Sequence, residues 1–224
     1  MQTYKKKFAE FLVRADALQF GEFTLKSGRS SPYFFNSSKF NNGPLIEELG
    51  SYYAAAIEEN APNCNLIYGP AYKGIPLCIS TAIALSARLN QNIGYFFNRK
   101  EKKTPGDQGT LVGQFPLAGD SVVMVDDVIT DGLTKIESVK LIRELCKVGF
   151  SGVLVSLDRM EKNSQDNDAI TEFQQKTSVP VWSIITIREI CDYLKNRKLG
   201  GSVVLDESTF LKIANYLAEH SVRS

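Results

Sequence analysis

The sequence predicts one α/β domain built on a doubly wound, mostly parallel sheet flanked by helices. Three observations support this fold class. Short apolar runs typical of buried strands alternate with segments of helical periodicity. The chain has 224 residues, which is enough for one such domain with a substantial core. Polar segments follow three of the apolar runs, and open α/β sheets bind their ligands at such strand ends.

The first part of the chain predicts three helices with strands between them. Apolar residues recur at helical spacing over residues 4–18, and helical patterns return at residues 45–59 and 75–89. The segment LQFGEFTLKSGRSSPYFF alternates in polarity and contains glycines and a proline, which favours short strands and turns. The segment NLIYGPAYKG indicates a buried strand that breaks into a loop.

The second part of the chain repeats this alternation of strand and helix. The runs IGYFF, VVMV, GVLVSL and VWSII predict strands, and helices are expected at residues 134–146, 168–176, 188–194 and 208–217. Residues 98–113, NRKEKKTPGDQGTLVG, are too charged and too rich in glycine to pack against a core. A long mobile loop is therefore predicted there.

The charge balance excludes several classes of partner. Lys and Arg number 26 against 25 Asp and Glu, so no net field would draw the protein to nucleic acid or to an anionic membrane. The N-terminal stretch has no apolar signal-peptide core, and no uncharged run approaches the length that spans a membrane. We therefore expect a soluble, cytoplasmic protein without nucleic acid or membrane partners, whose anion sites are local.

Cysteine and histidine usage narrows the chemistry. Cys64, Cys78, Cys146 and Cys191 lie far apart and form no CxxC motif, which favours reduced, mostly buried thiols over a disulfide framework or a zinc site. The single histidine, His220, lies four residues from the end of the sequence, where we expect a frayed position rather than an ordered catalytic group. The chemistry is therefore predicted to proceed without imidazole.

The segment VVMVDDVITDGLT carries the strongest chemical signal. Its apolar run ends in Asp126 and Asp127, which would reach the rim of the sheet, where carboxylates accept hydrogen bonds from vicinal hydroxyls. The following turn opens a helix, and the amides and dipole of a helix N-terminus hold phosphate. Together these features describe a phosphosugar site. Helix capping is the alternative, but one aspartate would suffice for it, and the P-loop and GxGxxG motifs are both absent.

This segment resembles the phosphoribosyl diphosphate signature of type I phosphoribosyltransferases. FGEFTLKSGRSSPYFFN, IYGPAYKGIP, FNRKEKKTPGDQGTLVG and VLVSLDRME are similar to segments of orotate phosphoribosyltransferases in the same order and spacing, over most of residues 4–195. The resemblance implies the type I phosphoribosyltransferase fold, with one domain at residues 1–224 and a small hood from about residues 1–40 and the C-terminal part. It also implies that orotate and phosphoribosyl diphosphate form orotidine 5'-monophosphate and pyrophosphate, a step in pyrimidine (UMP) biosynthesis.

The resemblance assigns residues to the phosphoribosyl diphosphate site. They are Tyr72, Lys73, Arg99, Lys100, Lys103, Asp126, Asp127, Val128, Ile129, Thr130, Asp131, Gly132, Leu133 and Thr134. Asp126 and Asp127 would hold the ribose hydroxyls, the turn from Thr130 to Thr134 would cradle the 5'-phosphate, and Lys103 would join the aspartates in catalysis. Magnesium would be carried mainly by the substrate diphosphate, with no metal site of the protein. The resemblance implies a homodimer in which the loop at residues 99–113 reaches the neighbouring site, so that Lys103 acts in trans.

The orotate site is assigned in the same way. The resemblance points to Lys26, Phe34, Phe35, Thr130 and Arg159. A flat anionic pyrimidine suits an aromatic wall with cations, because arginine can grip a carboxylate with paired donors. From composition alone, the two phenylalanines would be better explained as ordinary core.

Two departures from the family pattern bear on activity. The family's phosphate turn has small residues, as in TAGTA, whereas this chain has Asp131 and Leu133. Coulomb's law gives about 3 kcal/mol for a charge pair at ~5 Å with an effective dielectric of ~20, and about twice that against a dianion. Asp131 facing the phosphate would cripple binding, whereas Asp131 pointing into water or paired with Lys135 would cost far less. Pro105 replaces a histidine or tyrosine of the loop, which predicts slower closure and reduced turnover.

Two hypotheses follow. The first is an orotate phosphoribosyltransferase, a glycosyltransferase with reduced activity. The second is a catalytically impaired homologue that binds nucleotide or phosphoribosyl diphosphate as a regulator, and the departures at Asp131, Leu133 and Pro105 motivate it. A DNA-binding regulator on the same fold is disfavoured, because the sequence has neither an added helix-turn-helix segment nor a basic excess.

Overall fold

The structure describes most of the chain. The computed structural model describes residues 1–25, 28–100, 110–130, 132–146, 148–163 and 165–222. Four residues singled out in the sequence, Lys26, Lys103, Pro105 and Asp131, lie outside these ranges.

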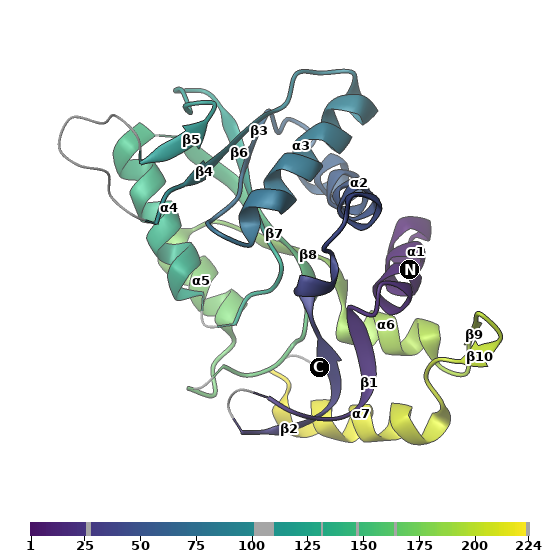
Figure 1. Ribbon diagram of the computed structural model, residues 1–224. Helices are drawn as coiled ribbons and strands as arrows, with labels where there is room; N and C mark the ends of the chain where they lie inside the picture. The colour runs from purple at the N-terminus through teal and green to yellow at the C-terminus, as the bar shows by residue number, and fades with distance from the viewer. Residues whose placement is uncertain (26–27, 101–109, 131, 147, 164, 223–224) are drawn as a thin grey trace.

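A six-stranded sheet forms the centre of the molecule (Figure 1). In spatial order its strands are β5 (Leu111–Gly113), β4 (Gly94–Asn98), β3 (Leu66–Tyr68), β6 (Ser121–Asp126), β7 (Gly149–Asp158) and β8 (Val181–Thr186). All neighbouring strands are parallel except β4 and β5. The chain builds outwards from β3 on one side and from β6 on the other, so the strand order reverses between them. Open α/β sheets bind ligands at this point, beyond the carboxyl ends of the strands.

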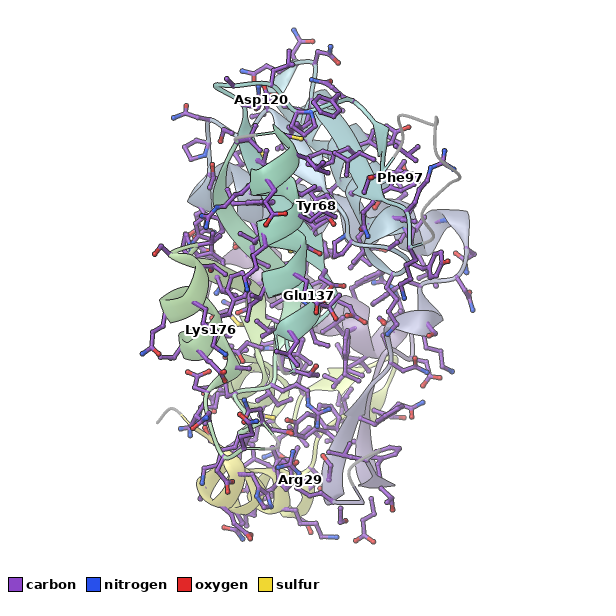
Figure 2. The ribbon with its side chains drawn as sticks, turned by 90° about the vertical axis from the view of Figure 1, so that its left-hand side faces the viewer. Arg29, Tyr68, Phe97, Asp120, Glu137 and Lys176 are labelled. Atoms are coloured by element: carbon purple, nitrogen blue, oxygen red, sulfur yellow. The ribbon has the colours of Figure 1, made fainter. Side chains whose placement is uncertain are left out.

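Helices cover both faces of the sheet, which confirms the predicted fold class (Figure 1). One face carries α1 (Thr3–Arg14), α2 (Gly43–Asn60) and α3 (Gly74–Leu89), and the other carries α4 (Leu133–Cys146) and α5 (Ala169–Thr177). Successive strand residues point to opposite faces, so Ile67 joins the hydrophobic cluster under α2 and α3, and Tyr68 joins the cluster under α4. Figure 2 shows Tyr68 beside α4. Both faces of the sheet are therefore buried.

A second, smaller layer lies below the sheet in the view of Figure 1. It contains the antiparallel strands β1 (Leu18–Thr24) and β2 (Ser30–Phe35), which pack beside α7 (Glu207–His220). The chain reaches α7 from β8 through α6 (Ile187–Leu194) and a hairpin of β9 (Lys198–Leu199) and β10 (Ser202–Val203), and a 3-10 helix, η1 (Ser37–Lys39), follows β2. Arg29 lies over the ring of Tyr216 in α7 (Figure 2). Segments from both ends of the sequence thus form one layer.

Two predicted boundaries were wrong. The first helix ends at Arg14 rather than at residue 18, because Asp16 has a φ of 56° and Leu18 already begins β1. The segment at residues 98–113 is not a loop throughout. Residues 111–113 form β5, because the apolar end of the segment pairs its backbone with the edge of β4. The β9–β10 hairpin was not predicted.

The C-terminal histidine is ordered, contrary to the prediction. The carbonyl of His220 accepts a hydrogen bond from the amide of Lys162 (2.9 Å), and its ring centroid lies 4.7 Å from that of Tyr216. The prediction for the cysteines is confirmed, since all four thiols are free and only Cys146 is not fully buried. Among the described residues, no helix has both the length and the apolar character needed to cross a membrane.

Candidate active site

A cavity of about 360 Å³ lies beyond the carboxyl ends of β3 and β6, where the strand order reverses. It is lined by Pro70, Ala71, Tyr72, Lys73, Lys100, Asp126, Asp127, Thr130, Gly132, Thr134 and Lys135. These residues come from the three polar segments that follow β3, β4 and β6. The three polar segments therefore converge at one edge of the sheet.

The backbone of the acidic pair is anchored from both sides. The hydroxyl of Tyr53, on α2, donates a hydrogen bond to the carbonyl of Asp126 (2.7 Å). The amide and the hydroxyl of Ser156, on β7, both donate to the carbonyl of Asp127 (3.0 and 2.6 Å). Because buried carbonyls need partners of this kind, the bonds fix the point at which β6 ends. The two carboxylates are thereby held at the rim of the sheet.

Each aspartate has its own ammonium group. The Nζ of Lys135 lies 2.6 Å from Oδ2 of Asp126, and the Nζ of Lys73 lies 2.8 Å from Oδ2 of Asp127. The hydroxyl of Ser37, in η1, also donates to Oδ2 of Asp127 (2.5 Å). Two neighbouring negative charges are thus compensated separately, one from α4 and the other from the segment before α3.

The pKa values of the two carboxyls move in opposite directions. Burial raises the pKa of Asp126; the charge of Lys135 opposes this rise and the neighbouring Asp127 adds to it. Burial would also raise the pKa of Asp127, but hydrogen bonds from Lys73 and Ser37 outweigh it and lower the pKa below its ordinary value. Asp127 is therefore an ionised acceptor at neutral pH, and the charge of Lys135 favours the ionised form of Asp126.

Close packing shapes the segment GPAYKG after β3. A Cβ on Gly69 would lie 2.1 Å from the carbonyl oxygen of Gly74, so only glycine lets the segment close onto the start of α3. The side-chain oxygen of Asn98, at the end of β4, accepts hydrogen bonds from the hydroxyl of Tyr68 (2.8 Å) and the amide of Ala71 (3.0 Å). The segment is therefore tied to the ends of two neighbouring strands.

Cations gather at the mouth of the cavity. Tyr72 is 63% exposed, and the Nζ of Lys100 lies 4.8 Å from the centroid of its ring. The side chain of Lys73 is 64% exposed. Arg99 is exposed but does not line the cavity, and its amide donates to the carbonyl of Thr110 (2.9 Å). An anionic ligand entering the cavity would meet the exposed side chains of Lys73 and Lys100.

The turn after the acidic pair leads into α4. Gly132 has a φ of +70°, a left-handed conformation that favours glycine, and its carbonyl accepts the amide of Ile136 (2.9 Å). Thr130 and Thr134 line the cavity, whereas Leu133 is 55% exposed and does not line it. A helix N-terminus attracts anions through its amides and its dipole. The described part of the turn therefore combines two hydroxyls with a helix N-terminus, which suits a phosphate group.

Arg159, just after β7, takes part in a buried ionic cluster. Its Nε and one terminal nitrogen donate to Oε1 of Glu161 (3.1 and 2.7 Å). Arg29 donates to the other carboxylate oxygen (2.6 Å), and the hydroxyl of Tyr33 donates to Oε1 (2.5 Å). The side chain of Glu161 is only 8% exposed. One carboxylate thus faces two guanidinium groups, so the cluster keeps a net positive charge.

Comparisons with known proteins agree with one another. No family model matches the sequence. An orotate phosphoribosyltransferase of Clostridium acetobutylicum is 38% identical over 224 residues, 100% of both chains, and one of Methylococcus capsulatus is 47% identical over 195 residues, 87% of this chain and 90% of that one. The chain belongs to the orotate phosphoribosyltransferase family. The crystal structure of the Francisella tularensis orotate phosphoribosyltransferase has a TM-score of 0.81 at 33% identity, covering 96% of this chain and 99% of that one.

The resemblance noted in the sequence and the type I phosphoribosyltransferase fold are thus confirmed, as is the glycosyltransferase class. Nothing in the described part of this orotate phosphoribosyltransferase favours the impaired regulator. Of the predicted phosphoribosyl diphosphate residues, the cavity brings together Tyr72, Lys73, Lys100, Asp126, Asp127, Thr130, Gly132 and Thr134. The side chains of Val128 and Ile129 pack against the two core clusters, and the amide of Val128 donates to the carboxylate of Asp127 (2.9 Å). Lys103 and Asp131 lie outside the described residues.

Of the predicted orotate residues that the structure describes, Thr130 lines this cavity, whereas Phe34, Phe35 and Arg159 do not. Phe34, on β2, stacks on Phe23 of β1 with their centroids 5.5 Å apart, and Phe35 packs against the larger core cluster. Arg159 belongs to the ionic cluster, which Tyr33 joins from β2. Lys26 lies outside the described residues.

The sequence analysis did not assign four residues that shape the site: Ser37, Asn98, Lys135 and Glu161. Lys135 had been considered only as a partner for Asp131, but the structure pairs it with Asp126. A signal for Lys135 was present, because this lysine shares the buried face of α4 with Val139 and Ile142, at the i, i+4 and i+7 positions of an apolar stripe. Ser37 and Asn98 act through contacts distant in sequence, and Glu161 joins its neighbour Arg159 to the distant Arg29 and Tyr33.

Proposed function

We propose that this orotate phosphoribosyltransferase binds phosphoribosyl diphosphate in the cavity beyond β3 and β6 and transfers the phosphoribosyl group to orotate there. The proposal rests on one observation, the convergence of two carboxylates, a helix N-terminus and three lysines on one cavity. The carboxylates accept hydrogen bonds from the ribose hydroxyls. The N-terminus of α4 holds the 5'-phosphate, and Lys73 and Lys100 face the diphosphate.

The chemistry suits an electrostatic site. When the bond between the sugar and the diphosphate breaks, positive charge develops on the ribose ring and negative charge on the leaving pyrophosphate. Asp126 and Asp127 hold the ribose close to fixed negative charge, while Lys73 and Lys100 stabilise the pyrophosphate. Lys103 is assigned to the same leaving group. The reaction then depends on positioning and charge, and no imidazole lines the cavity.

Magnesium enters the proposal with the substrate. Among the described residues, no group of three or more His, Cys, Asp or Glu side chains could hold a metal ion. Mg²⁺ binds readily through substrate phosphates and keeps several waters. The diphosphate held at Tyr72 and Lys73 would carry the ion, and the bound ion would neutralise charge on the leaving pyrophosphate.

We assign orotate to the space between the cavity and the layer of β1, β2 and α7, which serves as the hood. The net positive charge of the ionic cluster at Arg159 attracts the orotate anion. Two donors of Arg159 are committed to Glu161, so the other terminal nitrogen is the one expected to contact orotate. Phe34 and Phe35 provide the aromatic wall, and Thr130 and Lys26 complete the assignment.

The loop at residues 99–113 is proposed to complete the site of a partner subunit in a homodimer. Mixing two impaired variants, Lys103→Ala and Asp127→Asn, tests this arrangement. If Lys103 acts in trans, each mixed dimer contains one intact site, and random subunit exchange restores about a quarter of the wild-type activity. No recovery after exchange would place Lys103 in the site of its own chain.

A cytoplasmic location, without nucleic acid or membrane partners, stays a prediction.

Turnover by the purified protein tests the proposed function. With Mg²⁺, orotate and phosphoribosyl diphosphate, we expect orotidine 5'-monophosphate to form, and we expect no product with adenine in place of orotate. No product at an enzyme concentration equal to that of the substrates would refute the proposal. Tight binding of phosphoribosyl diphosphate without turnover would instead support the regulator.

Replacing Asp131 by alanine and Leu133 by threonine together shows whether the altered turn weakens binding. If it does, the double substitution should raise the affinity for phosphoribosyl diphosphate.

A further inference from the structure

The two ion pairs of the cavity differ in exposure. Lys135 is 7% exposed, and its ammonium group lies 2.6 Å from the carboxylate of Asp126. The side chain of Lys73, which pairs with Asp127 at 2.8 Å, is 64% exposed. An exposed lysine on a flexible stem can change partners easily, whereas a buried lysine is held by its surroundings. One ion pair is therefore fixed and the other is exchangeable.

Substrate binding would disturb the exchangeable pair. In the proposed function Lys73 faces the diphosphate, so its charge turns away from Asp127 when the substrate arrives. The phosphate groups also bring negative charge towards both aspartates. Each change favours the protonated form of the carboxyls, although the ribose hydroxyls need charged acceptors at that moment. A cation that stays beside the carboxylate when the substrate binds would keep it ionised.

We propose that Lys135 is a positioning residue that keeps Asp126 charged and directed at the ribose while Lys73 turns to the diphosphate. This inference rests on the proposed function and deepens it. Lys135 stands on the apolar face of α4 with Val139 and Ile142, where a buried charge costs desolvation that an apolar side chain would avoid. The pair with Asp126 offsets that cost and gives the lysine a role in the site.

The other titratable groups around Asp126 do not supply such a cation. Tyr53 from α2 and Tyr68 from β3 are neutral, because burial raises the pKa of both, to about 12 for Tyr68. Asp127, which directly follows β6, adds negative charge. Lys100, after β4, lies over a tyrosine ring at the mouth of the cavity. Among the described residues that line the cavity, Lys135 is the buried cation.

Substitution of Lys135 separates charge from shape. Lys135→Gln keeps a hydrogen-bond donor for Asp126 but removes the charge, and Lys135→Arg keeps the charge. The affinity for phosphoribosyl diphosphate with Mg²⁺ is measured by calorimetry from about pH 7 to about pH 9, since a carboxyl loses about tenfold in ionised fraction for each pH unit below its pKa. We expect affinity to change little with pH in the wild type and in K135R. In K135Q we expect it to fall towards neutral pH and to recover at high pH.

The controls separate this inference from the proposed function. Lys140→Gln changes an exposed lysine of the same helix and should bind like the wild type. A purely structural defect in K135Q would weaken binding equally at every pH, and a profile parallel to that of the wild type would overturn the inference alone. Wild-type protein that binds no phosphoribosyl diphosphate at any pH would overturn the proposed function.

A measurement on the wild-type protein covers the case in which K135Q does not fold. The ionisation of Asp126 is followed by the NMR shift of its carboxyl carbon, with and without saturating inorganic pyrophosphate as the probe that draws Lys73 away. We expect Asp126 to stay ionised at neutral pH in both states. Proton uptake by Asp126 when pyrophosphate binds would show that Lys135 does not hold the charge and would overturn the inference.

Discussion

Asp127→Asn removes one charge from the cavity and leaves the shape of the side chain almost unchanged. The carboxylate accepts hydrogen bonds from Lys73 (2.8 Å), Ser37 (2.5 Å) and the amide of Val128 (2.9 Å). The asparagine oxygen can replace part of this set, but the ion pair is lost. Because the side chain of Lys73 is 64% exposed, the lost pair should cost only about 0–1 kcal/mol in the free energy of unfolding.

The pH dependence of this small cost has a definite sign. The pKa of Asp127 is lowered in the folded protein, so its contribution to stability is present above the ordinary carboxyl pKa and is lost as the pH falls through the lowered value. Urea unfolding should therefore separate the wild type from D127N at neutral pH and bring them together in acid. A difference that grows in acid would contradict the assigned direction of the shift.

The effect of D127N on substrate should be larger than its effect on stability. A hydrogen bond to a charged acceptor contributes about 1.5–3 kcal/mol, which predicts a loss of about 10-fold to 150-fold in kcat/KM for phosphoribosyl diphosphate. Steady-state kinetics measure this loss. Asp166→Asn, at an exposed aspartate after β7, is the matched control and should behave as wild type. A kcat/KM for D127N within about threefold of the wild type would refute the assignment of the ribose to Asp127.

Three further predictions concern the frame of the site. Gly69→Ala would place a Cβ 2.1 Å from a backbone carbonyl oxygen, so it should lower the free energy of unfolding by about 1–3 kcal/mol and weaken substrate binding. The control Gly149→Ala should have little effect, because a Cβ there has no atom within 4 Å. Equal behaviour of the two variants would contradict the close packing at Gly69. Glu161→Ala leaves two guanidinium groups facing each other and should lower the free energy of unfolding by about 3 kcal/mol, with Glu161→Gln intermediate. Urea unfolding of E161A indistinguishable from the wild type would show that the cluster does not stabilise the layer of β1, β2 and α7. Burial raises the pKa of the Cys64 thiol to about 11. A thiol reagent at about pH 8 should therefore modify Cys146 alone in the native protein and all four cysteines in urea. Rapid labelling of Cys64 in the native protein would argue against its burial.

The sequence predicts the acidic pair well because strand burial and polarity are local properties. The run at Val122–Val125 is buried, and the next two residues reach the rim as soon as the sheet is parallel. Strand β5 could not be predicted in the same way, since a strand of three residues is too short to show a period and depends on the edge of β4 for its pairing. The charged, glycine-rich residues before β5 predict a loop, because such a segment cannot pack against a core.

The partners of the site residues were harder to predict than the residues themselves. Arg159 could be singled out from its segment, and its partner Glu161 lies only two residues away. The contribution of Arg29 depends on tertiary packing, which brings it into contact with Glu161, 132 positions away. Lys135 shows the opposite case. A lysine on an apolar helical face is visible in the sequence, but only the structure shows that Asp126 is its partner.

A crystal structure of the protein with Mg²⁺ and phosphoribosyl diphosphate tests the central claim most directly. We expect the ribose hydroxyls within hydrogen-bond distance of Asp126 and Asp127, and the 5'-phosphate at the N-terminus of α4 beside Thr130 and Thr134. A sugar phosphate bound with its ribose turned away from the acidic pair, or bound outside this cavity, would contradict it.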